Sequence, residues 1–241
     1  MASAPPVLEN VPGGGFRAPE SGRRYPGLTR RLKRAFFPRY KYNSAHRRTA
    51  PKRARTGGGG RNYGLWLGRK VHKQIERLTR DGPTGLRKRN DAMQMHTKRA
   101  ICAMRRWGWR ALKAEVPAFC DKMGVATRAD LLVRTADGGV AVVEWKTGYE
   151  GYWETGVNPM SGPLARRFSD SPLNQSLMQL LFTVMMLQRT YGFPITEAYV
   201  ANVKDGGVWR YPIPHEMWAA REALEGHFVG ATARRRRAAR P

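Results

Sequence analysis

The chain has 241 residues and a formal net charge of +26, with 44 Lys and Arg residues against 18 Asp and Glu residues. This length suits one sizeable α/β domain with tails, and the positive charge makes polyanions, nucleic acid first, the expected partners. Two cysteines without a CxxC pair argue against a zinc finger or a disulfide framework. No apolar run approaches the 18 residues that a membrane span needs, so we expect no membrane segment.

The positive charge is concentrated at the two ends of the chain. Residues 1–61 hold 15 Lys or Arg residues and two acidic residues, and residues 231–241 hold five Arg and no acidic residue. Because these stretches have few aliphatic residues, we expect two disordered basic tails around one domain over residues 62–230. A packaging or ribosomal-type protein that binds nucleic acid by charge alone would have similar tails.

The N-terminal tail contains two shorter signals. Residues 51–55, Pro-Lys-Arg-Ala-Arg, resemble a nuclear-import signal and predict a nuclear location, with a mitochondrial or virion-associated protein as the alternative. Aromatic residues interleave with cations at Phe36, Phe37, Tyr40 and Tyr42, a pattern that suits base stacking on single strands. An arm whose rings pack on the core would show the same pattern.

A first helix is predicted over residues 64–80, because apolar residues recur there at helical spacing: Leu67, Val71, Ile75 and Leu78. His72 and Glu76 are four residues apart and project from one side of this helix. Cations that include Arg69 and Lys73 fill the remaining face, which would be solvated and also line a nucleic-acid groove.

The rest of the chain predicts an α/β order. The expected elements are a helix over 91–107, a strand over 111–119 that contains Glu115, a β-hairpin over 128–147, a loop over 149–171, a helix over 173–191 with Gln175 and Gln179 on one polar line, strands over 195–204 and 208–212, and a helix over 214–228.

Three charged residues of the hairpin point to chemistry. Glu144 and Lys146 are two residues apart and share a face of their strand, and the hairpin can bring Asp130 beside them. Two carboxylates and an ammonium on a mostly buried sheet are costly unless they bind a cation or take part in a reaction. Carboxylate oxygens suit Mg²⁺ or Mn²⁺. A strand pair with solvated charges is the alternative interpretation.

Four signatures in the order of the chain resemble the PD-(D/E)XK nuclease superfamily, in its His-containing RecB-like branch. They are G-R-K-V-H-K-Q-I-E over residues 68–76, R-A-D-L-L over 128–132, V-E-W-K-T-G over 143–148 and Q-L-L-F over 179–182. CRISPR-associated RecB-like exonucleases and the mitochondrial genome-maintenance exonuclease belong to this branch. The chain departs from the pattern at Thr127 and Arg128, where the family has a glycine shortly before its Asp, and at Thr183, where it has a Tyr.

The resemblance implies a restriction-endonuclease-like core in which helices flank a central mixed β-sheet. It also implies a Mg²⁺- or Mn²⁺-dependent deoxyribonuclease without a small-molecule cofactor, an exonuclease that acts on DNA ends or single strands in replication, recombination or repair. The alternative is a retired nuclease fold that binds nucleic acid without cutting it. Neither the oligomeric state nor the cleavage polarity is predicted.

Roles follow from the resemblance, residue by residue. The implied metal ligands are His72, Asp130, Glu144 and the backbone carbonyl of Trp145. The implied catalytic residues are Asp130, Glu144, Lys146 and Gln179, with Lys146 positioning or deprotonating the attacking water. Supporting or second-metal positions are Glu76, Glu115 and Gln175. Contacts to DNA are expected from Arg69, Lys73 and Arg128.

Overall fold

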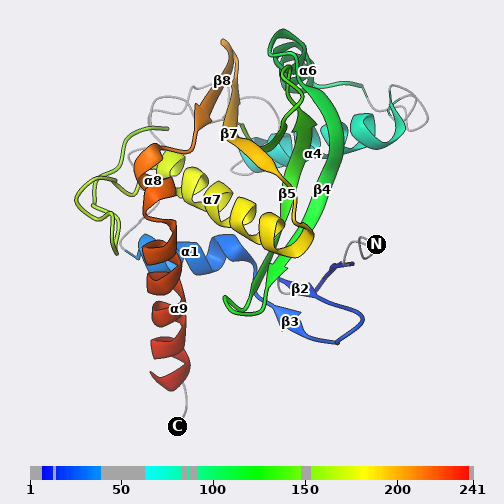
Figure 1. Ribbon diagram of the computed structural model, residues 1–241. Helices are drawn as coiled ribbons and strands as arrows, with labels where there is room; N and C mark the ends of the chain where they lie inside the picture. The colour runs from blue at the N-terminus through cyan, green and yellow to red at the C-terminus, as the bar shows by residue number, and fades with distance from the viewer. Residues whose placement is uncertain are drawn as a thin grey trace.

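The computed structural model describes residues 7–12, 15–38, 63–82, 86, 92–147 and 153–238. At its centre lies a five-stranded sheet with the order β4-β5-β6-β7-β8. The strands are β4 (Arg110–Cys120), β5 (Val125–Arg134), β6 (Val140–Thr147), β7 (Ile195–Lys204) and β8 (Gly207–Pro212). Only β6 and β7 pair in parallel, and the other neighbours are antiparallel. The predicted α/β fold with a central mixed sheet is confirmed (Figure 1).

Helices cover both faces of this sheet. Helix α7 (Pro172–Tyr191) packs on one face, while α4 (Tyr63–Asp81) and α6 (Met95–Arg106) lie on the other. Helix α7 begins at Pro172, whose fixed φ suits a first helical position, and Ser171 caps it by accepting the N–H of Asn174. It ends at Gly192, which adopts the left-handed conformation with φ of 65°. The predicted helices and strands between residues 64 and 212 all lie close to these elements.

The predicted disorder of the N-terminal tail is wrong for residues 7–12 and 15–38, the part of this tail that the structure describes. Three short antiparallel strands, β1 (Glu9–Asn10), β2 (Phe16–Arg17) and β3 (Arg24–Tyr25), lead into helix α1 (Leu28–Phe36). Helix α1 buries one stripe in the main core: Leu28, Leu32, Ala35 and Phe36. Arg-rich composition concealed this stripe, although its spacing is helical.

The structure tests the prediction for two of the four aromatic residues of this tail. Phe36 and Phe37 are both buried, so they pack on the core as the docked-arm interpretation expected. Tyr40, Tyr42 and the import-like segment 51–55 lie outside the described residues. Base stacking by Phe36 and Phe37 is thereby ruled out in this fold, because the buried Phe36 ring contacts Phe182 and Phe228 and the buried Phe37 ring contacts Phe36.

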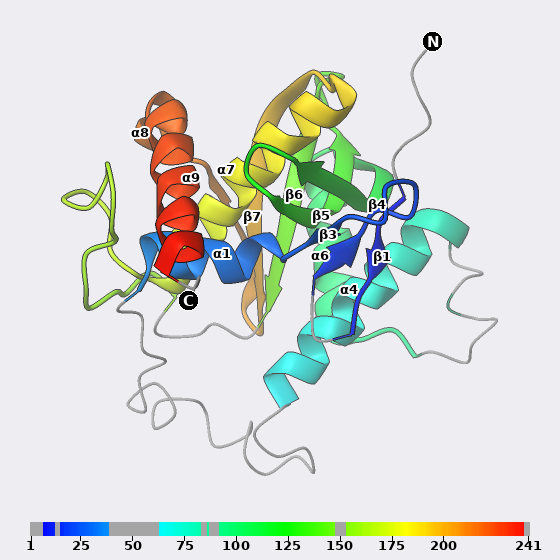
Figure 2. The same ribbon diagram turned by 90° about the horizontal axis from the view of Figure 1, so that it is seen from below.

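The C-terminal part forms two helices where one was predicted. Helix α8 (His215–Ala219) is followed by its C-cap residue, Ala220, and α9 (Arg221–Ala238) begins at the next residue. The predicted tail over 231–241 is therefore helical as far as Ala238. Both guanidinium ends of Arg189 on α7 donate to the buried Glu225 carboxylate, at 2.7 and 2.6 Å, and this pair attaches α9 to the core. Figure 2 shows α1 running from the N-terminal strands across to α9.

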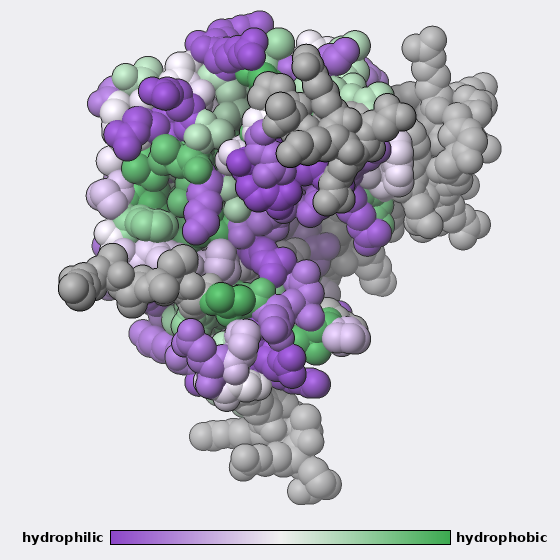
Figure 3. Space-filling model, turned by 90° about the vertical axis from the view of Figure 1, so that its right-hand side faces the viewer, coloured by the Kyte–Doolittle hydropathy of each residue, from purple (hydrophilic) through white to green (hydrophobic). Residues whose placement is uncertain are grey.

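The face in Figure 3 is mostly hydrophilic and carries scattered hydrophobic patches. Within the described ranges, no helix is both long enough and apolar enough to cross a membrane. The loop described over residues 153–171 is held by Asp170, whose buried carboxylate accepts the N–H groups of Val157 and Asn158.

Candidate metal centre

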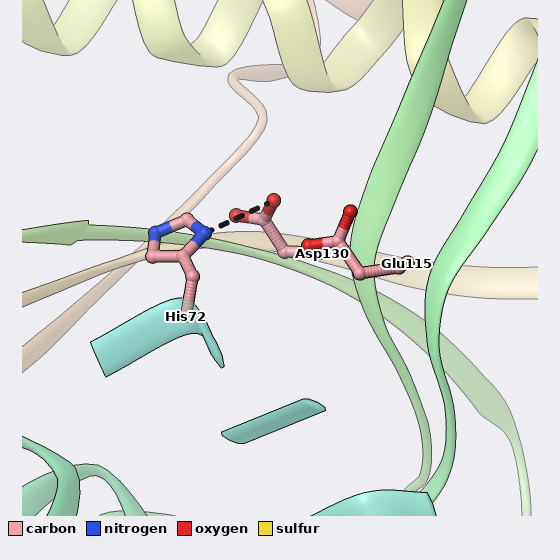
Figure 4. A group of neighbouring side chains, drawn as sticks. All are labelled: His72, Glu115 and Asp130. Carbon is pink, nitrogen blue, oxygen red and sulfur yellow. Dashed lines mark ion pairs between the residues drawn. The ribbon is translucent and has the colours of Figure 1, made fainter. Parts of the chain in front are cut away.

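Three side chains from three elements meet beside strands β4 and β5 of the sheet. His72 comes from α4, Glu115 from β4 and Asp130 from β5, and one ligand atom of each lies within 4.8 Å of the others. Figure 4 shows the imidazole and the two carboxylates side by side. Carboxylate oxygens and one imidazole nitrogen are ligands that Mn²⁺ accepts, and the oxygens also suit Mg²⁺. This cluster is a candidate divalent-cation site.

A close approach of α4 to β6 places His72. A Cβ atom on Gly68 would lie 3.1 Å from Thr147 Oγ1, so a glycine there lets the helix lie against the end of the strand. The apolar stripe Leu67, Val71 and Ile75 is buried against the sheet and fixes the rotation of the helix. One turn after Gly68, His72 Nε2 lies 3.0 Å from the carbonyl oxygen of Trp145.

His72 and Asp130 form an ion pair, with 3.4 Å between Nδ1 and Oδ1. Burial disfavours the His72 cation, but the Asp130 carboxylate outweighs burial and raises the pKa of His72 to about 9. Burial alone would likewise raise the pKa of Asp130. The His72 cation, the Lys146 ammonium and the N–H of Trp145, 2.8 Å from Oδ2, instead hold the pKa of Asp130 below its usual value. In the metal-free protein, a protonated His72 therefore supplies the positive charge beside Asp130 that a bound metal ion would otherwise supply.

Glu115 is held in an unusual backbone conformation. Its φ is 52°, and within the described ranges no other residue except glycine has a positive φ. The β4–β5 pairing steps from Ala114 with Leu131 to Val116 with Ala129, which leaves Glu115 beside Asp130. Burial and the Asp130 charge raise the pKa of Glu115. A strained residue that carries a carboxylate to another carboxylate is typical of a functional site.

Glu144 lies outside the three-residue cluster and has two partners of its own. Its Oε1 accepts from Lys146 Nζ at 2.6 Å and from Gln179 Nε2 at 2.7 Å. Its Oε2 is buried and accepts no hydrogen bond from the residues that the structure describes. Burial and the Asp130 charge raise the pKa of Glu144 to about 7. An oxygen in this position can accept a proton or bind a cation.

The predicted supporting residues have other partners. Glu76 pairs with Lys73 at 2.7 Å and with Arg80 at 3.5 Å, and it acts on the cluster only as one of the charges that raise the pKa of Glu115. Gln175 donates to the carbonyl of Asp170 and so holds the preceding loop. Of the three predicted supporting positions, Glu115 alone belongs to the metal-ligand cluster.

The predicted DNA-contacting cations also differ in their surroundings. Arg69 and Lys73 are exposed on α4, on the outer side of the domain. Arg128 instead donates to the carbonyl of Leu8 at 2.6 Å and to Asn10 Oδ1 at 3.2 Å, with its guanidinium over the Phe16 ring. Its guanidinium therefore fastens the N-terminal strands to β5.

The sequence pattern missed two sets of polar residues near the site. Thr29 and Lys33 come from α1, which composition alone placed in a tail. Asn202 stands opposite Lys146 on β7, is fully buried, and has no hydrogen-bond partner for either amide atom within the described ranges. The apolar stripe of α1 could have revealed the first set; Asn202 had no signal, because its burial depends on neighbours from distant segments.

Comparisons with known proteins give little beyond this geometry. No protein-family model matches the chain, and no curated protein is similar to it. A solved structure titled "Crystal structure of SSO0001" is similar with 14% sequence identity and a TM-score of 0.32, over 86% of this chain and 81% of that chain. A likeness this low supports no conclusion about function.

Proposed function

We propose that this protein is a Mg²⁺- or Mn²⁺-dependent deoxyribonuclease with a PD-(D/E)XK core of the RecB-like branch. The observation that supports it best is the meeting of His72, Glu115 and Asp130 beside the sheet, with Glu144 and Lys146 nearby on the central strand β6. Hydrolysis of a phosphodiester needs a water held in line with the phosphorus and compensation of the charge that develops there. The cluster and its basic surroundings offer both.

The donor set fits a divalent ion. His72, Glu115 and Asp130 would hold it, and the buried, unpartnered Oε2 of Glu144 is a further oxygen ligand. When bound, such an ion would neutralise phosphate charge and make a bound water more acidic. In this proposal the ligating nitrogen of His72 would lose its proton as the ion binds, because one nitrogen cannot hold a proton and a metal ion together.

The remaining polar side chains would act on the attacking water. Lys146 Nζ is held by the Glu144 carboxylate and would donate to the water or to a phosphate oxygen. Gln179 donates to the same carboxylate oxygen, so it helps to fix the Glu144 side chain that holds Lys146.

The test is digestion of end-labelled linear and of circular single-stranded DNA by the full chain, with Mg²⁺, Mn²⁺ or EDTA. We expect metal-dependent loss of the linear substrate only, which defines an exonuclease, and no loss with the Lys146→Ala protein. Loss of the circle as well would make the enzyme an endonuclease.

Binding without cleavage under both metals would refute the nuclease proposal. It would favour the alternative function, a basic protein that binds nucleic acid on a retired nuclease fold. The net charge of +26 supports that alternative as well as the first, so cleavage is the measurement that separates them.

A further inference from the structure

Helix α1 lies against the candidate metal centre, although it is far from it in sequence. Thr29 Oγ1 donates to Gln179 Oε1 at 3.1 Å, and Gln179 Nε2 donates to Glu144. Because Glu144 can only accept from the amide nitrogen, the Gln179 amide must present its oxygen to Thr29. A chain of two hydrogen bonds therefore connects α1 to a carboxylate of the site.

The sequence of α1 gives this helix a cationic outer surface. Its nine residues include no acidic residue and four cations: Arg30, Arg31, Lys33 and Arg34. Lys33 follows Thr29 by four residues, so both lie on the flank of the helix that faces Gln179. Arg31 lies on the opposite flank, because the buried stripe of Leu28 and Leu32 separates the two sides.

Lys33 and Lys146 are close enough to influence each other. The pKa of Lys33 is lowered, mainly because its ammonium is partly desolvated and secondly because the Lys146 charge lies near it. Its side chain nevertheless remains exposed to solvent. A phosphate group of a nucleic acid beside these two ammonium groups would be attracted by both and would reduce their mutual repulsion.

We propose that α1 forms one wall of the substrate-binding surface, where Lys33 binds a backbone phosphate of the DNA strand beside the metal centre and Thr29 positions Gln179. The identity of the ligand as DNA rests on the proposed function. The apolar anchoring of α1 between α7 and α9 makes this wall a rigid part of the domain. The helix would thus bind the substrate through the charge of Lys33 and would orient Gln179 through the hydrogen bond from Thr29.

The first experiment measures binding of a fluorescent single-stranded oligonucleotide in EDTA over a series of salt concentrations. Lys33→Ala is compared with Arg105→Ala, a matched loss of one exposed charge on α6, which packs on the other face of the sheet. We expect Lys33→Ala to weaken binding several-fold and to lower the slope of log affinity against log salt by about 0.7, one phosphate contact on a single strand. Arg105→Ala should leave the slope unchanged. Equal slopes for the two variants would overturn the inference.

The second experiment tests Thr29 by cleavage kinetics with Mn²⁺. Thr29→Val removes the hydroxyl at nearly constant shape, and Thr29→Ser retains it. We expect Thr29→Val to lower kcat with KM unchanged and Thr29→Ser to restore it, which a merely structural role would not produce. Unchanged kcat for Thr29→Val would overturn the positioning role.

The two measurements separate this inference from the proposed function. If the wild-type protein binds in a Lys33-dependent way but never cuts, the nuclease proposal fails and the phosphate-binding wall stands. If it cuts and Lys33→Ala binds like Arg105→Ala, the nuclease proposal stands and the inference fails.

Discussion

Replacing Glu115 tests both the backbone strain and the metal site. A residue with a side chain costs about 1–2 kcal/mol in the left-handed conformation that Glu115 adopts at a φ of 52°. Glycine avoids this cost but loses about 0.5–1 kcal/mol in chain entropy within a strand. The difference leaves Glu115→Gly more stable than Glu115→Ala by about 1 kcal/mol, the reverse of the order at an ordinary strand position.

The assay is urea unfolding in EDTA and again in excess Mn²⁺. In EDTA we expect the order Gly above Ala at position 115 and the order Ala above Gly at Arg134, an exposed position on the neighbouring strand β5 that pairs in register with Arg110 and Val140. In Mn²⁺ at about a hundred times its dissociation constant, the wild-type protein should gain about 2.7 kcal/mol, and both variants should lose most of this gain.

Two results would refute this reasoning. If Glu115→Ala is as stable as Glu115→Gly, the backbone at this position is not strained. If Mn²⁺ stabilises both variants as much as the wild-type protein, the Glu115 carboxylate is not a ligand.

Three further predictions concern other contacts. The His72 pKa of about 9 lies above its ordinary value of 6.5, so the ion pair with Asp130 stabilises the metal-free protein below pH 6.5 and is lost as the pH rises to about 9. Urea unfolding in EDTA should show this decline, at most about 3 kcal/mol, and His72→Gln should remove it. Arg189 lowers the pKa of Glu225, so that pair stabilises the fold above the ordinary Glu value and is lost as the pH falls through the lowered pKa. Glu225→Gln should lower the free energy of unfolding by about 1 kcal/mol at pH 7 and should reduce its decrease at acidic pH. An unchanged decrease at acidic pH would contradict this role. Gly68→Ala should weaken Mn²⁺ binding in calorimetric titration, because its Cβ would press on Thr147 Oγ1, and adding Thr147→Ala should restore binding. If the double variant binds no better than the single one, the close approach of α4 does not set the site.

Much of the domain could be predicted because its elements have strong local periodicity. The stripe of Leu67, Val71 and Ile75 predicts α4, and the Gly-Gly turn between two apolar runs predicts the β5–β6 hairpin. The hairpin geometry also predicted that Asp130 lies beside Glu144, a consequence of the regular geometry of the backbone. That His72 joins them was implied by the resemblance to the RecB-like nucleases and not by spacing.

Other features depended on packing between distant segments. Composition assigned α1 to a disordered tail, since four cations in nine residues outweigh a short apolar stripe in any local average. The stripe is buried against α7, α9 and β5, all of which are distant from α1 in the sequence. Thr29 reaches Gln179 for the same reason.

The sequence by itself determined the class of the fold, the order of its central elements and the residue types of the candidate site. The tertiary structure decided which of those residues meet. It brought Glu115 to His72 and Asp130 through a strained backbone, left Glu76 and Gln175 with other partners, and used Arg128 to hold the N-terminal strands. Local periodicity specifies the direction of a side chain from its own element, whereas its neighbours depend on how elements pack, and that is a property of the whole chain.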